Sequence, residues 1–148
     1  MELVEVREIF RHSLTRISGQ IAGITLTPAD RVEFSEEYYM GVIYTKGKFA
    51  AMVEFFWCKE LYEYIACQMT GGRGVSDEDK VLYVNEYMNI ICGKALSDIN
   101  NILGKPASRL SVPAINRGRK TVGATGHEDN VLAYKTDHGV MLVRLVCE

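Results

Sequence analysis

The longest helical pattern in this chain of 148 residues runs from Ser76 to about residue 103. Ser76 is suited to be an N-cap, acidic residues follow it in the first turn, and Gly104 and Pro106 end the pattern. Eight apolar residues lie on one stripe of the pattern: Val81, Val84, Met88, Ile91, Cys92, Ala95, Ile99 and Ile102. The sequence therefore predicts one long helix whose apolar stripe faces the core.

Polar residues in segment 85–93 lie away from the centre of that stripe. At about 100° per residue, Glu86 and Asn89 are roughly 60° apart, and Gly93 projects between them one turn further on. A carboxylate, a carboxamide and a bare patch of backbone on an exposed helix face are suited to contact a partner. Polar pairs at this spacing are also common on solvated helices, so both interpretations stay open from the spacing alone.

The pattern Glu86-x-x-Asn89-x-x-x-Gly93 on a long helix, followed about two dozen residues later by a strand with Ser111-Val112-Pro113, resembles the CheX branch of the CheC/CheX/FliY chemotaxis phosphatases. The order of elements supports this resemblance over most of the chain. An N-terminal helix comes first, then a hairpin punctuated by Gly41 and Gly47, the long helix, and a strand with a Pro-x-x-x-x-Gly pattern over 113–118.

The remaining patterns predict an α+β fold in a single domain over residues 1–148. Helical periodicity covers residues 3–21 and 59–69, and the glycine-rich segment 71–74 reads as a linker between helices. Strands are expected at 41–44, 49–56, 109–115, 121–125, 131–136 and 140–147, with Pro113 at an edge or a bulge. The resulting expectation is an antiparallel sheet with about three helices on one face, which is also the CheX/CheC-like architecture.

Composition excludes several classes of function. The net charge of −2 gives no bulk attraction to nucleic acid or to an anionic membrane. The first residues are acidic where a signal peptide would be basic, and no apolar run approaches the roughly 20 residues that span a bilayer. The four cysteines and three histidines have no metal-ligand spacing, so no metal site is expected. A cytoplasmic location is the expectation.

The resemblance implies hydrolysis of the aspartyl phosphate on a CheY-like response-regulator receiver. It implies catalytic roles for Asn89, which would orient the attacking water, and for Glu86, which would pair with a lysine of the receiver. Gly93 would let the receiver approach the helix closely. The chain would need no cofactor of its own, because the Mg²⁺ ion would belong to the receiver.

Neighbouring residues are candidates for partner binding. Asn85 and Tyr87 are bulkier than the residues usual beside this motif, and they are expected to contribute to the docking face, although packing against a neighbouring helix is an equally good interpretation for Tyr87. Leu82 stands where related motifs often have Asp or Ser. The basic cluster Arg117, Arg119 and Lys120 either receives an acidic receiver surface or is simply a solvated turn.

The resemblance implies a homodimer joined through the sheet, and the lack of a second Glu-x-x-Asn copy implies one active site per chain. The alternative function is a non-catalytic CheX-like module that binds a receiver or a flagellar-switch partner. A small-molecule sensor would need a pocket with convergent polar groups, for which the sequence gives no sign.

Overall fold

The computed structural model describes residues 1–147, and Glu148 lies outside the described residues. The helices are α1 (Leu3–Ala22), α2 (Lys59–Met69) and α3 (Asp77–Leu103). The strands are β1 (Thr27–Pro28), β2 (Arg31–Phe34), β3 (Tyr38–Lys46), β4 (Ala51–Cys58), β5 (Arg109–Leu110), β6 (Ala114–Arg117), β7 (Val122–Thr125), β8 (Val131–Thr136) and β9 (Gly139–Cys147). The predicted α+β class, the three helices and the hairpin of β3 and β4 are confirmed.

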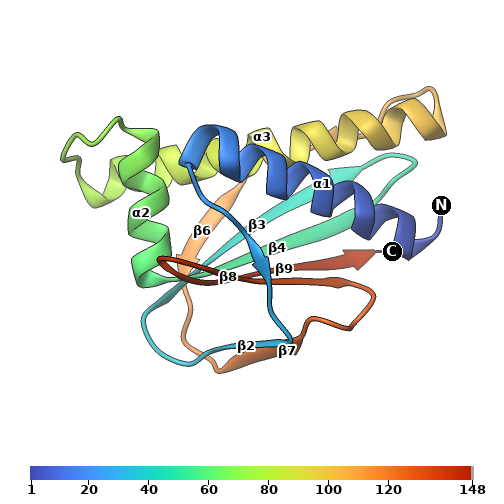
Figure 1. Cartoon of the computed structure of the whole chain (residues 1–148). Coiled ribbons are helices and arrows are strands. Elements are labelled where there is room, and N and C mark those ends of the chain that lie inside the picture. Colours follow the sequence, from blue (N-terminus) through green and yellow to red (C-terminus); the bar gives the residue numbers. More distant parts are fainter. Residues whose placement is uncertain (148) are drawn as a thin grey trace.

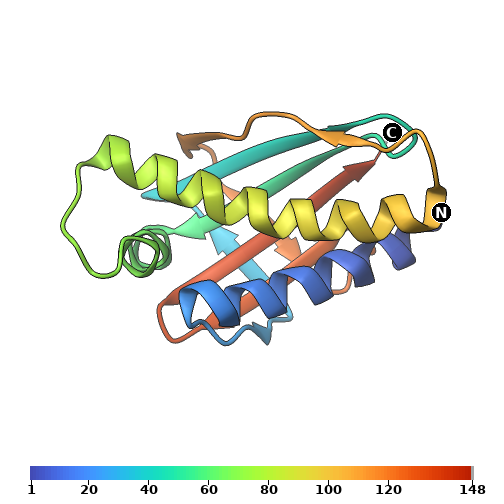
Figure 2. The same cartoon turned by 90° about the horizontal axis from the view of Figure 1, so that it is seen from above.

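The main sheet is antiparallel and has the strand order β1-β8-β9-β4-β3-β5, with β6 also paired to β3. All three helices lie on one face of this sheet (Figure 1). Seen from above, α1 and α3 run side by side across the sheet, and α2 stands at the end where α3 begins (Figure 2). A second sheet of only β2 and β7 covers part of the opposite face, and the sequence patterns did not predict it.

Two apolar layers hold the elements together. The larger layer lies between the helices and the main sheet, and its fully buried side chains include Phe10, Ile43, Trp57, Ile65 and Ile91. The smaller layer lies between the main sheet and the β2–β7 pair. Burial on both faces explains the almost continuous apolar sequence of β4, whose residues 53–57 are all buried.

Gly41 sets how closely α3 approaches the sheet. A Cβ atom at this position of β3 would lie 2.4 Å from the sulfur of Met88 on α3 and 3.0 Å from Trp57. Met88 and Trp57 are both fully buried, so the space that a side chain would need is already occupied. The glycine therefore allows the middle of α3 to pack directly on β3.

Two local expectations need correction. The predicted strand over 109–115 is divided into β5 and β6, and Pro113 lies in the break between them, consistent with a proline at a sheet edge. Ile102, predicted on the buried stripe of the long helix, is 60% exposed. It lies with Val4 along an open groove between the start of α1 and the end of α3, where neither helix covers it.

No helix in the described part of the chain is both long enough and apolar enough to cross a membrane.

Candidate functional site

The outward-facing side of α3 brings together four residues from the sequence analysis. Leu82, Glu86, Asn89 and Gly93 follow one another at intervals of four, three and four residues, so they form one stripe along the helix. Leu82 is 65% exposed and Glu86 is exposed, whereas Asn89 and Gly93 are half-buried. We call these four residues the α3 outer stripe. The predicted surface position of Glu86 and Asn89 is therefore confirmed.

Gly93 leaves an open place in this stripe. No atom lies within 4 Å of the position that a Cβ would take, and the residue has ordinary helical geometry. Glycine is a poor helix former, and nothing within the fold requires it at this position. A partner that must approach the helix backbone would supply the missing reason.

Tyr87 lies on the opposite side of α3 from solvent, which corrects its prediction as a partner-binding residue. Its side chain is 0% exposed, and its hydroxyl lies 2.6 Å from the hydroxyl of Ser18 on α1. Its ring also packs near Trp57, with ring centroids 6.4 Å apart. Packing against a neighbouring helix, the other interpretation of this tyrosine, is the one that the structure shows.

Buried hydrogen bonds fix α3 from behind the outer stripe. Besides the contact between Tyr87 and Ser18, the hydroxyl of Ser13 on α1 donates to the backbone carbonyl of Ile91 at 2.7 Å. Burial raises the pKa of the Tyr87 phenol, against a smaller opposing effect of its hydrogen bond to Ser18, so the group stays neutral and keeps this bond at physiological pH. The polar residues of the outer stripe therefore stand on a helix that is held in place by α1.

Asn85 is only half-buried, but its carboxamide oxygen is shielded from solvent and has no hydrogen-bond partner among residues 1–147. An unpaired buried oxygen costs free energy, and no hydrogen bond among the described residues offsets that cost. Its predicted contact with a partner stays a prediction.

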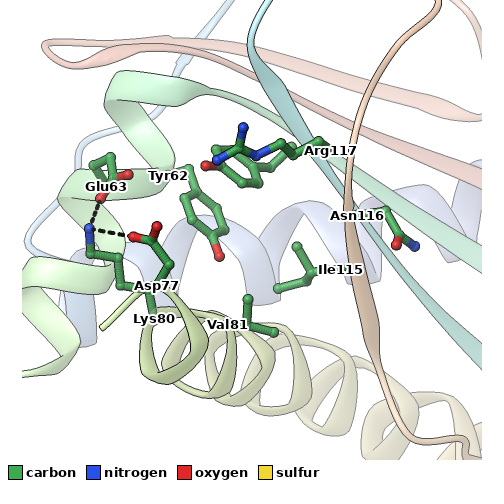
Figure 3. A pocket seen from close by; sticks show the side chains of 9 residues that line it. Tyr62, Glu63, Asp77, Lys80, Val81, Ile115, Asn116 and Arg117 are labelled. Atoms are coloured by element: carbon green, nitrogen blue, oxygen red, sulfur yellow. Dashed lines mark hydrogen bonds and ion pairs between the residues drawn. The ribbon is translucent and has the colours of Figure 1, made fainter. Parts of the chain in front are cut away.

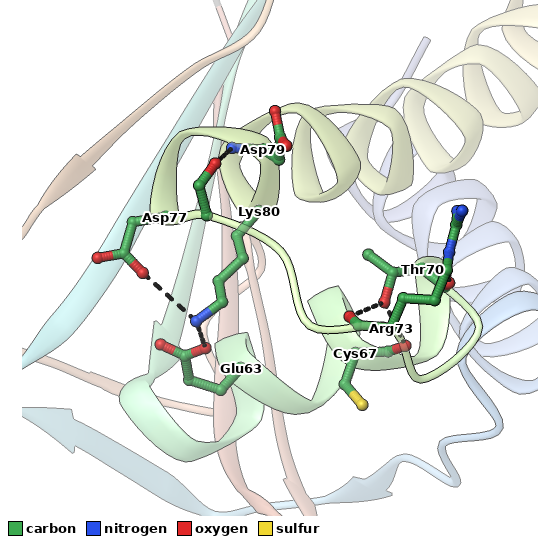
Figure 4. Close-up of polar contacts among 8 residues, drawn as sticks. Glu63, Cys67, Thr70, Arg73, Asp77, Asp79 and Lys80 are labelled. Carbon is green, nitrogen blue, oxygen red and sulfur yellow. Dashed lines mark hydrogen bonds and ion pairs between the residues drawn. The ribbon is translucent and has the colours of Figure 1, made fainter.

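The first turns of α3 are tied to α2 through charge. Lys80 lies 2.8 Å from Glu63 of α2 and 3.4 Å from Asp77, and the hydroxyl of Ser76 accepts from the backbone N–H of Asp79 (Figure 4). The hydrogen bond with Glu63 is the main cause that raises the pKa of Lys80, so this ammonium stays charged. These contacts therefore fix the N-terminal end of α3, which is the end of the helix nearest Leu82.

The predicted basic cluster of Arg117, Arg119 and Lys120 is not simply a solvated turn, because part of it contacts the rest of the fold. Arg117 lies over the ring of Tyr39, with the guanidinium carbon 5.8 Å from the ring centroid. Arg119 and Lys59 line a hollow of about 330 Å³ beside it. Arg117 also borders a second cavity, beside α2 and α3, which the sequence did not reveal because its walls come from four separate elements.

Among residues 1–147, no group of three or more His, Cys, Asp or Glu side chains is arranged to hold a metal ion. The polar groups available on the outer stripe are one carboxylate and one carboxamide. These groups can pair with a cation, accept from water and donate to an oxygen.

No protein-family model and no curated protein sequence matches this chain. Solved structures do match it. CheX from Desulfovibrio desulfuricans superposes with a TM-score of 0.77 at 18% identity, covering 97% of this chain and 99% of that chain. CheX from Vibrio vulnificus gives a TM-score of 0.78 at 16% identity, covering 100% and 99%. This chain has the CheX/CheC-like fold.

The same fold occurs in a CheX protein solved in complex with a partner. The CheX–CheY–BeF₃–Mg²⁺ complex from Borrelia burgdorferi matches with a TM-score of 0.68 at 12% identity, covering 95% of this chain and 96% of that chain. In the CheX-like fold of the present chain, the long helix α3 carries the Glu-x-x-Asn motif on its exposed side.

Proposed function

We propose that this protein is a phosphatase that hydrolyses the aspartyl phosphate of a CheY-like response-regulator receiver. The observation that carries the proposal is the α3 outer stripe, on which Glu86, Asn89 and the open Gly93 share the exposed side of a helix anchored from behind. The similarity to a CheX protein that forms a complex with CheY supports the choice of partner.

Asn89 is the residue that we assign to water activation. Hydrolysis of an acyl phosphate requires mainly that water is held in line with phosphorus and that the developing charge is stabilised. A carboxamide accepts a hydrogen bond from water through its oxygen and donates through its nitrogen, without carrying a charge that would repel a phosphoryl group. Asn89 would enter the receiver's site from the outer stripe.

Glu86 and Gly93 would position the receiver rather than react. Glu86 is exposed and has no ion pair among the described residues, so its carboxylate is available for a lysine of the receiver. Gly93, one turn beyond Asn89, would let the receiver surface approach the backbone of α3. Asn85 borders the same part of the helix and would contribute through its amide group.

The divalent metal belongs to the receiver in this proposal, and the chain requires no cofactor of its own. The Borrelia burgdorferi complex contains Mg²⁺ together with CheX and CheY. A receiver substrate would imply a cytoplasmic location.

We also propose that two copies pair through the main sheet. Tyr44, Met52 and Val146 are register partners on β3, β4 and β9, and they face away from the helices at the end of the sheet that β2 and β7 leave uncovered. Tyr44 is 50% exposed and Val146 is 41% exposed. A second copy would cover this apolar row.

The second candidate function is a non-catalytic module that binds a receiver or a flagellar-switch protein through the same surface. The similar fold of a FliM protein solved in complex with SpeE from Helicobacter pylori favours this candidate, at a TM-score of 0.60 and 9% identity. The two functions differ in what they require of Asn89, since binding alone does not need a group that orients water.

The deciding experiment follows the decay of a phosphorylated receiver with the wild type, with Asn89→Ala and with Asn101→Ala. Asn101 is an exposed asparagine on the same helix, outside the outer stripe, and serves as the matched control. We expect the wild type and Asn101→Ala to accelerate decay equally and Asn89→Ala to lose the acceleration while its affinity for the receiver persists. Equal binding of all three proteins with no acceleration by any of them would favour the non-catalytic module.

A further inference from the structure

A cavity of about 250 Å³ lies between α2, the first turns of α3 and the strands β3 and β6 (Figure 3). It is distinct from the outer stripe, whose four residues do not line it. The lining residues that matter here include Tyr39, Tyr62, Lys80, Val81, Ile115 and Arg117. At about 30 Å³ per water molecule, this space equals roughly eight waters, which is the size of an amino acid or a small aromatic acid.

The hydroxyl of Tyr62 at the inner end of this cavity has no partner. The side chain is 2% exposed, and its oxygen makes no hydrogen bond among residues 1–147. Figure 3 shows this hydroxyl directed at the space between Asp77, Val81 and Ile115. Burial raises the pKa of the phenol, so the group keeps its proton and is a hydrogen-bond donor. Because Tyr62 lines the cavity, we take a ligand in the cavity as the partner of this donor.

Arg117 is exposed and supplies a cation at the edge of the cavity. Its guanidinium lies over the ring of Tyr39, which is itself stacked on Tyr62 with centroids 3.8 Å apart and planes 10° from parallel. This stack holds the cation at the edge of the cavity. No carboxylate of residues 1–147 forms an ion pair with Arg117. Its donors are therefore free for an anion.

The other charged groups of the cavity are one ammonium and two carboxylates. Lys80 holds both Glu63 and Asp77, at 2.8 and 3.4 Å, so these two carboxylates compete for one ammonium. Their remaining negative charge would oppose a ligand with several negative charges. The cavity as a whole combines one free cation, one free neutral donor and two aromatic rings.

We propose that this cavity is a binding site for a small molecule that carries a single carboxylate. The carboxylate would pair with Arg117, as planar guanidinium groups favour, and an acceptor atom of the molecule would receive the proton of the Tyr62 hydroxyl. Val81 and Ile115 would contact its apolar part. With this site the domain would also sense a small acid, although its sequence gives no sign of a pocket. This proposal does not depend on the proposed phosphatase activity.

The first test measures thermal unfolding of the full chain with three monocarboxylates, namely acetate, glycine and benzoate. Inorganic phosphate and sulfate serve as anion controls. A bound ligand at ten times its Kd raises the Tm of a domain of this size by about 3–6 °C. We expect at least one carboxylate to produce such a rise and the two inorganic anions to produce little. An equal rise with phosphate or sulfate, or none with any carboxylate, would overturn the proposal.

Matched variants locate the binding. Tyr62→Phe and Arg117→Gln each remove one proposed contact, and either change should abolish the rise in Tm caused by the active carboxylate. Tyr64→Phe on the same helix and Arg119→Gln in the same basic cluster lie outside the cavity lining and should retain it. Loss of the rise in the two control variants, or its retention in Tyr62→Phe and Arg117→Gln, would place binding elsewhere and refute this site.

The stability of the ligand-free protein provides a second test of the proposed site. Because the Tyr62 hydroxyl is buried without a partner, Tyr62→Phe should raise the Tm of the ligand-free protein by about 2–4 °C. A fall in Tm would show that the hydroxyl already has a satisfied hydrogen bond in the free protein and would remove the main argument for a ligand. Amide chemical-shift changes in ¹H–¹⁵N NMR spectra, confined to residues near 62, 81 and 115–117, would confirm the location independently.

Discussion

The hydroxyls of Tyr87 and Ser18 lie 2.6 Å apart in the core between α3 and α1, directly behind the surface that carries Glu86 and Asn89. Tyr87 directly follows Glu86 in sequence, yet it points to the opposite side of the helix. A rotation of about 100° per residue produces this separation. One segment of α3 thus supplies both the exposed polar groups and the buried hydrogen bond that fixes their orientation.

This relationship predicts how stability depends on pH. Burial raises the pKa of Tyr87 above the value of about 10 in the unfolded chain, so the folded state favours the protonated phenol. The associated stabilisation is complete below about pH 10 and is lost as the pH rises towards the folded-state pKa, at up to about 1.4 kcal/mol per pH unit. Urea unfolding of the wild type between pH 8 and pH 11 should show this decline.

The variant Tyr87→Phe should lose about 1 kcal/mol at pH 8, because it loses the hydrogen bond to Ser18, and should decline less steeply above pH 10. Ser18→Ala is the matched control, since it removes the same hydrogen bond but keeps the phenol and therefore keeps the steep decline. Parallel curves for Tyr87→Phe and the wild type would show that Tyr87 does not contribute to the alkaline loss.

The contact between Gly41 and Met88 predicts a second effect on stability. Gly41→Ala places a methyl group 2.4 Å from the Met88 sulfur, so it should lower the free energy of unfolding by about 1–3 kcal/mol. In a Met88→Ala background the same change should cost less, because the space is then open. Chemical denaturation of the four proteins in this cycle measures the coupling, and a coupling of zero would contradict a direct contact.

Much of the fold follows from patterns that operate within one element. The end of α1 at Gly23, the hairpin of β3 and β4, and α3 with its N-cap Ser76 are all local in origin. The burial of Tyr87 was also present in the sequence, since Val84, Tyr87, Met88 and Ile91 follow the spacing of a core-facing stripe. The position of Tyr87 beside Glu86 favours a surface interpretation, which this apolar spacing contradicts.

Features that depend on several elements could not be predicted. The strand β2 has only four residues and gains its partner β7 from a segment about 90 residues later. The cavity beside α2 combines Tyr62 with Arg117, which are 55 positions apart, and neither has a local signal. Ile102 fits the apolar period of α3 and is nevertheless exposed, because periodicity says nothing about where a neighbouring helix ends.

The exposed row on the sheet predicts the state of assembly. If two copies pair through Tyr44, Met52 and Val146, light scattering should give twice the 16.6 kDa chain mass for the wild type and the single-chain mass for Tyr44→Glu. A charge at a buried apolar interface is costly, so one substitution should suffice. Ile102→Glu, at a comparably exposed apolar position on the helical side, should remain dimeric. A monomeric wild type would contradict this pairing.

Glu86 should affect binding more than turnover. Glu86→Lys places a cation against the expected lysine of the receiver and should raise the KM for the phosphorylated receiver by about 10–100-fold, with kcat at saturation largely kept. Glu36→Lys, a charge reversal at an exposed position in the turn before β3, is the matched control and should leave both constants unchanged. Higher salt should narrow the difference between Glu86→Lys and the wild type. A lower kcat with an unchanged KM would instead assign Glu86 to the chemical step.

Gly93 offers a test in which stability and function change in opposite directions. Gly93→Ala should raise the free energy of unfolding by about 0.5–1 kcal/mol, because alanine is the better helix former and nothing lies within 4 Å of the new methyl group. Gly93→Leu should also fold at least as stably as the wild type, but its side chain would stand where the receiver approaches. We expect its KM for the phosphorylated receiver to rise at least about 10-fold.

The matched control for this steric effect is Asn101→Leu, which adds the same side chain at an exposed position two turns further along α3. It should fold normally and act on the receiver at the wild-type rate. If Gly93→Leu is also as active as the wild type, the receiver does not approach α3 at Gly93, and the docking role of this part of the outer stripe is wrong. If Gly93→Ala lowers stability, the fold itself requires the glycine, and its openness is no argument for a partner.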